Sequence, residues 1–218
     1  MLPFGLPRPG DRPLRVVALG AHSDDIEIGA AGTLARLLAE RPDTAITWAV
    51  MGAEGRRAEE ALASARDWLA GARGAHVAVR PFADGFFREH WGPLKRAVRE
   101  VAALAAAPDL VFVHTRDDRH PDHQVLAELA WDTFRDATIL EYEIPKWDGD
   151  LGRPNLYAPL DAALAERKIT ALLGHFGTQR GKDWFDAATF RGLLRLRGLE
   201  CRAPDGYAEA FCARKLAI

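Results

Sequence analysis

Short apolar runs alternate with longer segments of helical spacing through most of this 218-residue chain. The runs are five to seven residues long, and turn formers such as Pro42, Gly71 and Pro108 separate them from their neighbours, as expected of buried strands. Between the runs, apolar residues recur three or four positions apart, as in helices that pack one face on a sheet. This spacing predicts strands at 14–20, 45–51, 75–79, 110–114, 138–142 and 207–212, and helices at 27–40, 57–70, 93–107, 121–136, 161–173 and 184–197.

Strands and helices in alternation predict an α/β fold, namely a Rossmann-like layered domain with a mostly parallel central sheet flanked by helices. The length suits a single domain over residues 1–218, with residues 1–12 as an N-terminal extension. Residues 144–160 are rich in turn formers and predict a long surface loop. Because loops of that length are usually functional, we expect this one to form a wall of the substrate site.

Charge and cysteine content argue against several classes of protein. A formal net charge of −2 provides no attraction for nucleic acid or an anionic membrane. No run of about 18 apolar residues is present, and the N-terminal segment lacks the apolar core of a signal peptide. Only Cys201 and Cys212 occur, too few for a disulfide framework or a zinc ribbon. We therefore expect a cytoplasmic protein without nucleic-acid partners or a membrane span.

Two clusters of imidazole and carboxylate groups each follow a predicted strand. Ala21–Glu27 follows the first strand, and Asp117–His123 follows the fourth. Ligands of open α/β sheets bind beyond the carboxyl ends of strands, so the two clusters meet if these strands are neighbours. His22, Asp25 and His123 would then bind one divalent ion and leave a position for water, as in catalytic zinc sites. Fe²⁺ or Co²⁺ would suit the same ligands.

Three other residues of these clusters have the chemistry of catalytic groups. Asp24 lies beside a predicted ligand and could take a proton from a metal-bound water. Asp122 could fix the tautomer of His120 or keep it protonated. A protonated His120 would stabilise a tetrahedral oxyanion and then protonate the leaving amine. The alternatives are a simple aspartate N-cap in the first cluster and a helix start with incidental histidines in the second, but two such clusters among only seven histidines favour the metal site.

These clusters resemble the PIG-L/LmbE family of metal-dependent N-deacetylases. That family carries Ala-His-x-Asp-Asp-x-Glu after its first strand and His-Pro-Asp-His after a later one, as at 21–27 and 120–123 here. Further matches are Gly29 and Gly32, Arg57 and Glu60, the Lys168–Gln179 stretch and the Tyr207–Phe211 segment.

The resemblance implies that the three predicted ligands bind zinc, that Asp24 is the general base, and that His120 with Asp122 serves as oxyanion donor and acid. It also implies an N-acetylated sugar or glycoconjugate as substrate, with Arg57 at a polar part of it. Some members of the family have a tyrosine at the position of Asp118. We therefore place Asp118 among the substrate contacts.

Further substrate contacts are predicted from their position alone. Glu143 lies past the fifth strand, where a carboxylate could bind sugar hydroxyls, and Trp147 could offer an aromatic face from the 144–160 loop. His175 is a third candidate, with a structural role as its alternative. An ordinary surface loop or an oligomer contact is the alternative for Trp147. His114 either faces the site or serves as a hydrogen-bonded structural residue.

Together these features predict a zinc-dependent hydrolase that removes an N-acetyl group from an amino sugar or sugar-containing metabolite by attack of zinc-bound water. A zinc amidase for another small amide conjugate would share the site and differ only in its pocket. A receiver-like signalling module also has an acidic pair after its first strand. It needs an aspartate ending the third strand and a lysine ending the fifth, where this chain has Val79–Pro81 and Glu141–Glu143. A homo-oligomer is compatible with either enzyme.

Overall fold

In the computed structural model, which describes residues 12–216, seven strands form one sheet in the order β3-β2-β1-β4-β5-β7-β6. The first five run parallel to their neighbours, and β7 runs antiparallel to both β5 and β6. The predicted α/β fold with a mostly parallel sheet is confirmed. The strands are β1 (Arg15–Gly20), β2 (Ala45–Val50), β3 (Gly74–Val79), β4 (Leu110–His114), β5 (Thr138–Tyr142), β6 (Leu156–Leu160) and β7 (Tyr207–Ala213).

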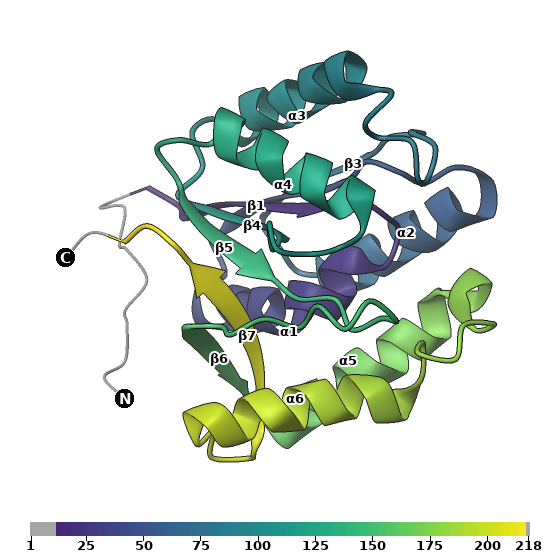
Figure 1. Cartoon of the computed structure of the whole chain (residues 1–218). Coiled ribbons are helices and arrows are strands. Elements are labelled where there is room, and N and C mark those ends of the chain that lie inside the picture. Colours follow the sequence, from purple (N-terminus) through teal and green to yellow (C-terminus); the bar gives the residue numbers. More distant parts are fainter. Residues whose placement is uncertain (1–11, 217–218) are drawn as a thin grey trace.

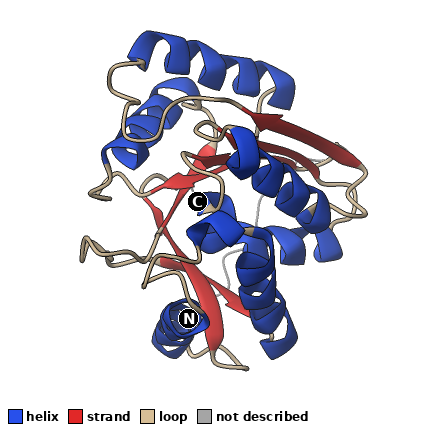
Figure 2. Cartoon of the chain, turned by 90° about the vertical axis from the view of Figure 1, so that its right-hand side faces the viewer, coloured by secondary structure: helices blue, strands red, loops and turns tan. Residues whose placement is uncertain are grey.

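Helices cover both faces of the sheet (Figures 1 and 2). On one face lie α3 (Trp91–Ala105) and α4 (Pro121–Thr133), whose buried residues share one apolar core with the sheet. The opposite core is built by four helices, and a single 3-10 turn follows the third of them. These elements are α1 (Asp25–Glu40), α2 (Gly55–Trp68), α5 (Ala162–His175), η1 (Gly177–Gln179) and α6 (Ala187–Cys201).

The central position of β1 in the sheet explains why its sequence is apolar without interruption. Val16 and Ala18 belong to the core beneath α1, whereas Val17 and Leu19 belong to the core beneath α3 and α4. Successive side chains of a strand point to opposite faces, so a strand covered on both faces needs an apolar residue at every position.

The strand order places the ends of β1 and β4 at the point where the chain reverses its direction of travel across the sheet. From β1 the chain moves through β2 to β3 on one side, and from β4 it moves to β5 on the other. β1 and β4 are paired in parallel register, with Val16 opposite Leu110. Their carboxyl ends therefore open into the crevice where α/β sheets bind ligands.

Helix α1 lies unusually close to the sheet because two of its residues are glycines. A Cβ atom at Gly29 would lie 2.2 Å from Cδ2 of Tyr142 on β5, and one at Gly32 would lie 2.6 Å from Leu160 on β6. Tyr142 in turn donates a hydrogen bond from Oη to the carbonyl of Leu19 on β1, at 2.6 Å. The absence of side chains at both positions sets the height of α1 above the sheet.

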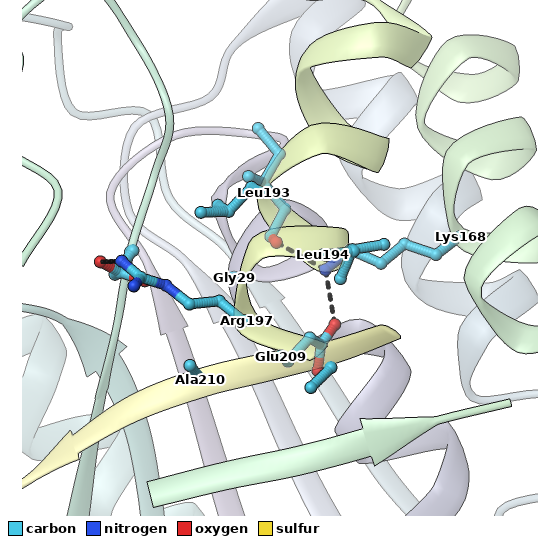
Figure 3. Close-up of a pocket in the computed structure, with 10 residues that line it drawn as sticks. Gly29, Lys168, Leu193, Leu194, Arg197, Glu209 and Ala210 are labelled. Atoms are coloured by element: carbon cyan, nitrogen blue, oxygen red, sulfur yellow. Dashed lines mark hydrogen bonds and ion pairs between the residues drawn. The ribbon is translucent and has the colours of Figure 1, made fainter. Parts of the chain in front are cut away.

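A buried ion pair also contacts this helix (Figure 3). Lys168 of α5 donates to Glu209 of β7 at 2.5 Å and to the carbonyl of Ile28 in α1 at 2.6 Å. Glu209 accepts hydrogen bonds from the backbone N–H groups of Gly32 and Thr33. The small cavity beside this pair, about 20 Å³, holds no more than one water molecule and is too small for a substrate.

Residues 156–160 correct the expectation of an unbroken loop over 144–160. They form β6, which pairs antiparallel with β7 at the edge of the sheet. The pattern is obscured by Pro159, a residue that strands tolerate mainly at an edge. Helix α5 also continues past its predicted end to His175. Of the predicted N-terminal extension 1–12, residues 1–11 lie outside the described part of the chain.

Replacing Gly29 with alanine is expected to destabilise the fold by about 1–3 kcal/mol, because the new methyl group would overlap the ring of Tyr142. Thermal or urea unfolding followed by circular dichroism measures the effect.

The matched control is Gly192→Ala in α6, where an added Cβ meets no atom within 4 Å. That change should leave stability unchanged or raise it by up to about 1 kcal/mol, since alanine favours the helix. Equal effects at the two positions would contradict the close approach of α1 to β5.

Candidate metal centre

The three predicted ligands meet beyond the ends of β1 and β4. His22 lies in the turn after β1, Asp25 begins α1, and His123 lies in the first turn of α4. Their nearest atoms form a triangle: His22 Nδ1 lies 3.2 Å from His123 Nε2, Asp25 Oδ2 lies 3.5 Å from His22 Nδ1, and it lies 3.6 Å from His123 Nε2. All three residues are buried.

This triangle has the dimensions of a metal site. Tetrahedral Zn²⁺ with bonds of about 2.0–2.1 Å separates its ligand atoms by about 3.3–3.4 Å. Burial lowers the pKa of His123 to about 4, so its ring is neutral, as a ligand must be. Burial opposes ionisation of Asp25, but the imidazoles of His123 and His114 hold the pKa of that carboxyl well below its usual range. Burial opposes protonation of His22, but three carboxylates hold its pKa well above the usual range, namely those of Asp122, Asp25 and Asp84. A cation would therefore have to displace the proton of this ring. The positions of the three donor atoms fit a divalent cation without large rearrangement.

In both histidine ligands, the ring nitrogen that faces away from the other ligands contacts a carboxylate. Asp118 Oδ2 lies 2.9 Å from Nδ1 of His123. On His22, Nε2 lies 3.0 Å from Asp84 Oδ1 and 3.2 Å from Asp122 Oδ2. Such carboxylate partners fix the orientation of a ligating ring and raise its basicity. The carboxylates leave His22 Nδ1 and His123 Nε2 turned toward Asp25.

Asp118 occupies a different place from the substrate contact that we expected. Its side chain is 1% exposed, and its second oxygen accepts the backbone N–H of His120 at 2.8 Å and lies 3.0 Å from the ammonium of Lys146. With both oxygens engaged, Asp118 orients His123 and does not face the open side of the site.

Asp84 is a member of this site that the sequence reasoning missed. It lies in the loop between β3 and α3, and it bridges His22 to Arg57 of α2, with 2.8 Å between Asp84 Oδ2 and Arg57 Nη1. Its position could have been a signal in the sequence. Asp84 follows the predicted strand 75–79 by a few residues, and the other site residues also follow the ends of strands at this edge of the sheet. The bridge connects Arg57 to the metal triangle.

Asp24 is buried beside the triangle and does not cap α1. It occupies the N-cap position, yet its side chain makes no capping hydrogen bond. Burial and the neighbouring Asp25 raise the pKa of Asp24 to about 6, against the opposing charges of Lys182, His22 and Arg57. A carboxylate with that pKa and no hydrogen bond to any of residues 12–216 is suited to exchange protons.

His120 also lies in the cluster, but its partner is not the one we expected. Its Nδ1 accepts the backbone N–H of Asp122, at 3.2 Å. The carboxylate of Asp122 instead contacts His22 and accepts the backbone N–H groups of Gly85 and Phe87. Because Nδ1 is an acceptor, the ring of His120 carries its proton on Nε2.

His114 is fully buried at the end of β4, and the structure brings it into the cluster. Its Nε2 lies 3.2 Å from Asp25 Oδ2, and its ring stacks on that of His123 with centroids 3.8 Å apart. Asp25, His114 and His123 accordingly form a second group of atoms close enough to share an ion. His114 thus contacts two of the predicted ligands directly.

Three predicted substrate contacts lie outside this cluster. Both oxygens of Glu143 pair with Arg197 of α6, at 2.6 and 2.9 Å. His175 lies 3.2 Å from Asp67, near the far end of α2. Trp147 is 68% exposed and donates from Nε1 to Asp183 at 2.6 Å. Trp147 keeps a largely exposed ring, and His175 is partly exposed and borders an open hollow of about 330 Å³ between α2 and the turn after α5.

A comparison with known families matches residues 17–134, more than half of the chain, to the family described as PIG-L, GlcNAc-PI de-N-acetylase. The chain belongs to the PIG-L family. The match contains His22, Asp25 and His123, so the family region includes the whole metal triangle. The predicted family resemblance is confirmed.

Solved structures with the same fold include a conserved protein from Thermus thermophilus, at 21% identity and a TM-score of 0.71, covering 94% of this chain and 96% of that one. The N,N'-diacetylchitobiose deacetylase from Pyrococcus horikoshii has 20% identity and a TM-score of 0.64, covering 95% of this chain and 86% of that one. GalB, the 4-carboxy-2-hydroxymuconate hydratase from Pseudomonas putida, has 18% identity and a TM-score of 0.67, covering 94% and 98%.

These neighbours share the fold of this PIG-L family protein, but the fold hosts more than one reaction, so its activity has to be argued from the site. The family and the deacetylase neighbour support a hydrolytic deacetylase with a candidate His/Asp metal site. Over residues 12–216, we find no helix with the length and apolar character needed to cross a bilayer.

The purified PIG-L family protein is expected to contain about one divalent ion per chain, and His123→Ala should lose it, because the variant removes one corner of the ligand triangle. Elemental analysis by plasma mass spectrometry after gel filtration measures the content. The control is His76→Ala on β3, an exposed histidine outside the cluster, which should keep the ion. Equal metal content in the two variants would place the ion elsewhere.

Asp118→Asn should weaken metal affinity by about 10- to 100-fold, because the amide is a poorer partner for the ring of His123. Competition with a chromogenic chelator measures the affinity. The neighbouring Asp117→Asn is the matched control, since Asp117 is exposed and pairs with Arg214. A normal affinity for Asp118→Asn would show that this contact does not tune the site.

Proposed function

We propose that this PIG-L family protein is a zinc-dependent deacetylase that removes the N-acetyl group from an amino sugar or a sugar-containing metabolite. The observation that carries the proposal is the ligand triangle of His22, Asp25 and His123, with sides of 3.2–3.6 Å. Beside it lies the buried carboxylate of Asp24, which makes no capping hydrogen bond to α1. The family description and the chitobiose deacetylase of the same fold support this reaction class.

A bound Zn²⁺ would supply Lewis acidity to a water molecule and to the acetamide carbonyl. Asp24 accepts one proton of the attacking water as the water oxygen bonds to the carbonyl carbon. His120 donates a hydrogen bond from its Nε2–H to the developing oxyanion and keeps its proton. When the C–N bond breaks, the proton held by Asp24 passes to the departing nitrogen. The products are the amine and acetic acid, and the acid then gives its proton to the amine or to solvent and leaves as acetate.

This assignment moves one role from His120 to Asp24. The sequence predicted that a protonated His120 would give its proton to the amine. In the structure, Nδ1 of His120 accepts the N–H of Asp122, which leaves one ring proton, and a neutral imidazole is a poor acid. Asp24 therefore acts first as base and then as acid, and His120 acts as an oxyanion donor.

We retain Arg57 and Trp147 as proposed substrate contacts. Arg57 reaches the metal triangle through Asp84, and Trp147 packs edge-on against Trp184 with centroids 6.1 Å apart. The exposed ring of Trp147, backed by the half-buried Trp184, suits the apolar face of a sugar ring, which favours an N-acetyl sugar over other amides. A zinc amidase for another small conjugate is the alternative, and a panel of N-acetyl sugars and other amides separates the two.

We also propose that the enzyme works on a small molecule in a reducing cytoplasm. Cys201 and Cys212 are both free thiols, which supports such a compartment. Cys201 is buried, so it contributes to packing.

Asp24→Asn is expected to lower the turnover of N,N'-diacetylchitobiose or N-acetylglucosamine by about 10²- to 10⁴-fold while metal content stays at the wild-type level, because it removes the proton acceptor and no ligand. Acetate release in a coupled assay, with metal analysis of the same sample, measures both quantities.

The control for this variant is Asp43→Asn, an exposed aspartate in the turn before β2. It should change neither turnover nor metal content. Full activity in Asp24→Asn with metal bound would remove Asp24 from the mechanism.

A further inference from the structure

Lys146 is a cation in the loop between β5 and β6, and the proposed reaction does not use it. Its side chain is only 7% exposed, and its ammonium lies between two carboxylates. It donates a hydrogen bond to Oδ2 of Asp150 at 2.6 Å and lies 3.0 Å from Oδ1 of Asp118. Burial opposes the charge of Lys146, but the two carboxylates raise its pKa above the usual value. A lysine is rarely buried unless it is paired, so these contacts account for its position.

The contact with Asp118 leads to a metal ligand. Oδ2 of Asp118 lies 2.9 Å from Nδ1 of His123, whose Nε2 belongs to the metal triangle. Oδ1 of Asp118 accepts the backbone N–H of His120 at 2.8 Å, and the ammonium of Lys146 contacts the same oxygen. Because Oδ1 is held by two groups, the carboxylate presents Oδ2 to the ring of His123. One residue therefore separates Lys146 from a ligand, through two contacts of 3.0 Å or less.

The charge of Lys146 also allows two carboxylates to lie close together. The side chains of Asp118 and Asp150 are 1% and 6% exposed, and both contact the same ammonium. Like charges repel each other strongly where little water screens them. Without the ammonium, a rotation of Asp118 away from Asp150 would relieve this repulsion and would carry Oδ2 away from His123.

The loop that supplies Lys146 also carries a proposed substrate contact. Trp147, with its exposed ring, is the next residue. Asp150 attaches this loop to the segment before α4, because its Oδ2 also accepts the backbone N–H of Arg119 at 2.7 Å. The proposed wall of the substrate site is thus connected to the metal triangle through the side chain of Lys146.

We propose that Lys146 is a positioning residue of this site, which fixes the orientation of the metal ligand His123 by holding Asp118. The carboxylates around its ammonium belong to Asp118, Asp148 and Asp150, and none of them is a predicted ligand, so Lys146 acts through Asp118. The inference rests on the proposed deacetylase function and deepens it, because it gives the substrate-side loop a second task, the support of the metal centre.

The test is a double-mutant cycle of Lys146→Met and Asp118→Asn, in which competition with a chromogenic chelator measures the affinity for Zn²⁺. Lys146→Met alone should weaken the affinity by about 10-fold, at the lower end of the effect of removing a partner from a histidine ligand. In the Asp118→Asn background the same substitution should cause little further loss, because its path to His123 is already broken. Lys146→Arg, which keeps the charge, should recover most of the affinity.

Asp150→Asn is the matched control. It removes the charge of the other carboxylate beside Lys146 and leaves the contact with Asp118 in place. The affinity for Zn²⁺ should stay near the wild-type value. A lysine that only supported the loop would instead make Asp150→Asn as harmful as Lys146→Met. Circular dichroism shows whether each variant is folded, and Lys146→Gln takes the place of Lys146→Met in the cycle if the latter is not.

Two results of the cycle would overturn the inference. Losses that add up in the double mutant would mean that Lys146 does not act through Asp118. Tighter binding of Zn²⁺ by Lys146→Met would mean that the lysine only repels the cation.

Acetate release from N-acetylglucosamine, measured on the same proteins, separates this inference from the proposed function. If the wild-type protein binds Zn²⁺ but releases no acetate, the deacetylase proposal loses its support, and the cycle still decides the role of Lys146. If acetate is released but the losses in the cycle are additive, the inference fails and the proposed function stands. A wild-type protein that binds no Zn²⁺ would reject both.

Discussion

The close seating of α1 on the sheet is the constraint on which the rest of the structure depends. Gly29 lets the helix backbone meet the ring of Tyr142, and the buried Lys168–Glu209 pair contacts the backbone of the same helix from α5 and β7. A buried ion pair adds little net stability, but its geometry is exacting, and removing one partner is costly. These contacts place Asp25, the first residue of α1, within reach of side chains from β4 and α4.

A helix seated in this way brings several carboxylates into a small and largely dry volume. Asp24, Asp25, Asp118 and Asp122 are all at most 4% exposed. Such a group is tolerable only if each member has a partner or a proton. Asp118, Asp122 and Asp25 use imidazoles and backbone N–H groups, whereas Asp24 has no hydrogen bond of this kind. Of these four carboxylates, Asp24 is the one to which we assign the proton transfers, while Glu27 in the first turn of α1 is a further buried carboxylate whose oxygens have no hydrogen bond within residues 12–216.

Much of the fold and of the metal triangle could be predicted because the signals were local. Continuous apolar runs such as Val16–Leu19 require burial on both faces, and His22 and Asp25 lie three residues apart in one turn. Residues whose roles depend on distant partners were not predictable in this way. Asp118 was taken for a substrate contact, since its position against His123 depends on how the loop before α4 folds. Asp84 comes from another loop, whose path local spacing does not determine.

The amino-acid sequence by itself determined the alternation of strands and helices, the family, and the candidate metal ligands, because periodicity and short motifs are properties of neighbouring residues. Only the tertiary structure decided which strands are adjacent, that β6 closes the edge of the sheet, and which carboxylates stand behind each imidazole. The same holds for the hydrogen-bond partner of His120. These features depend on the distances between elements, and those distances follow from how side chains such as Tyr142 pack against glycines far away in the chain.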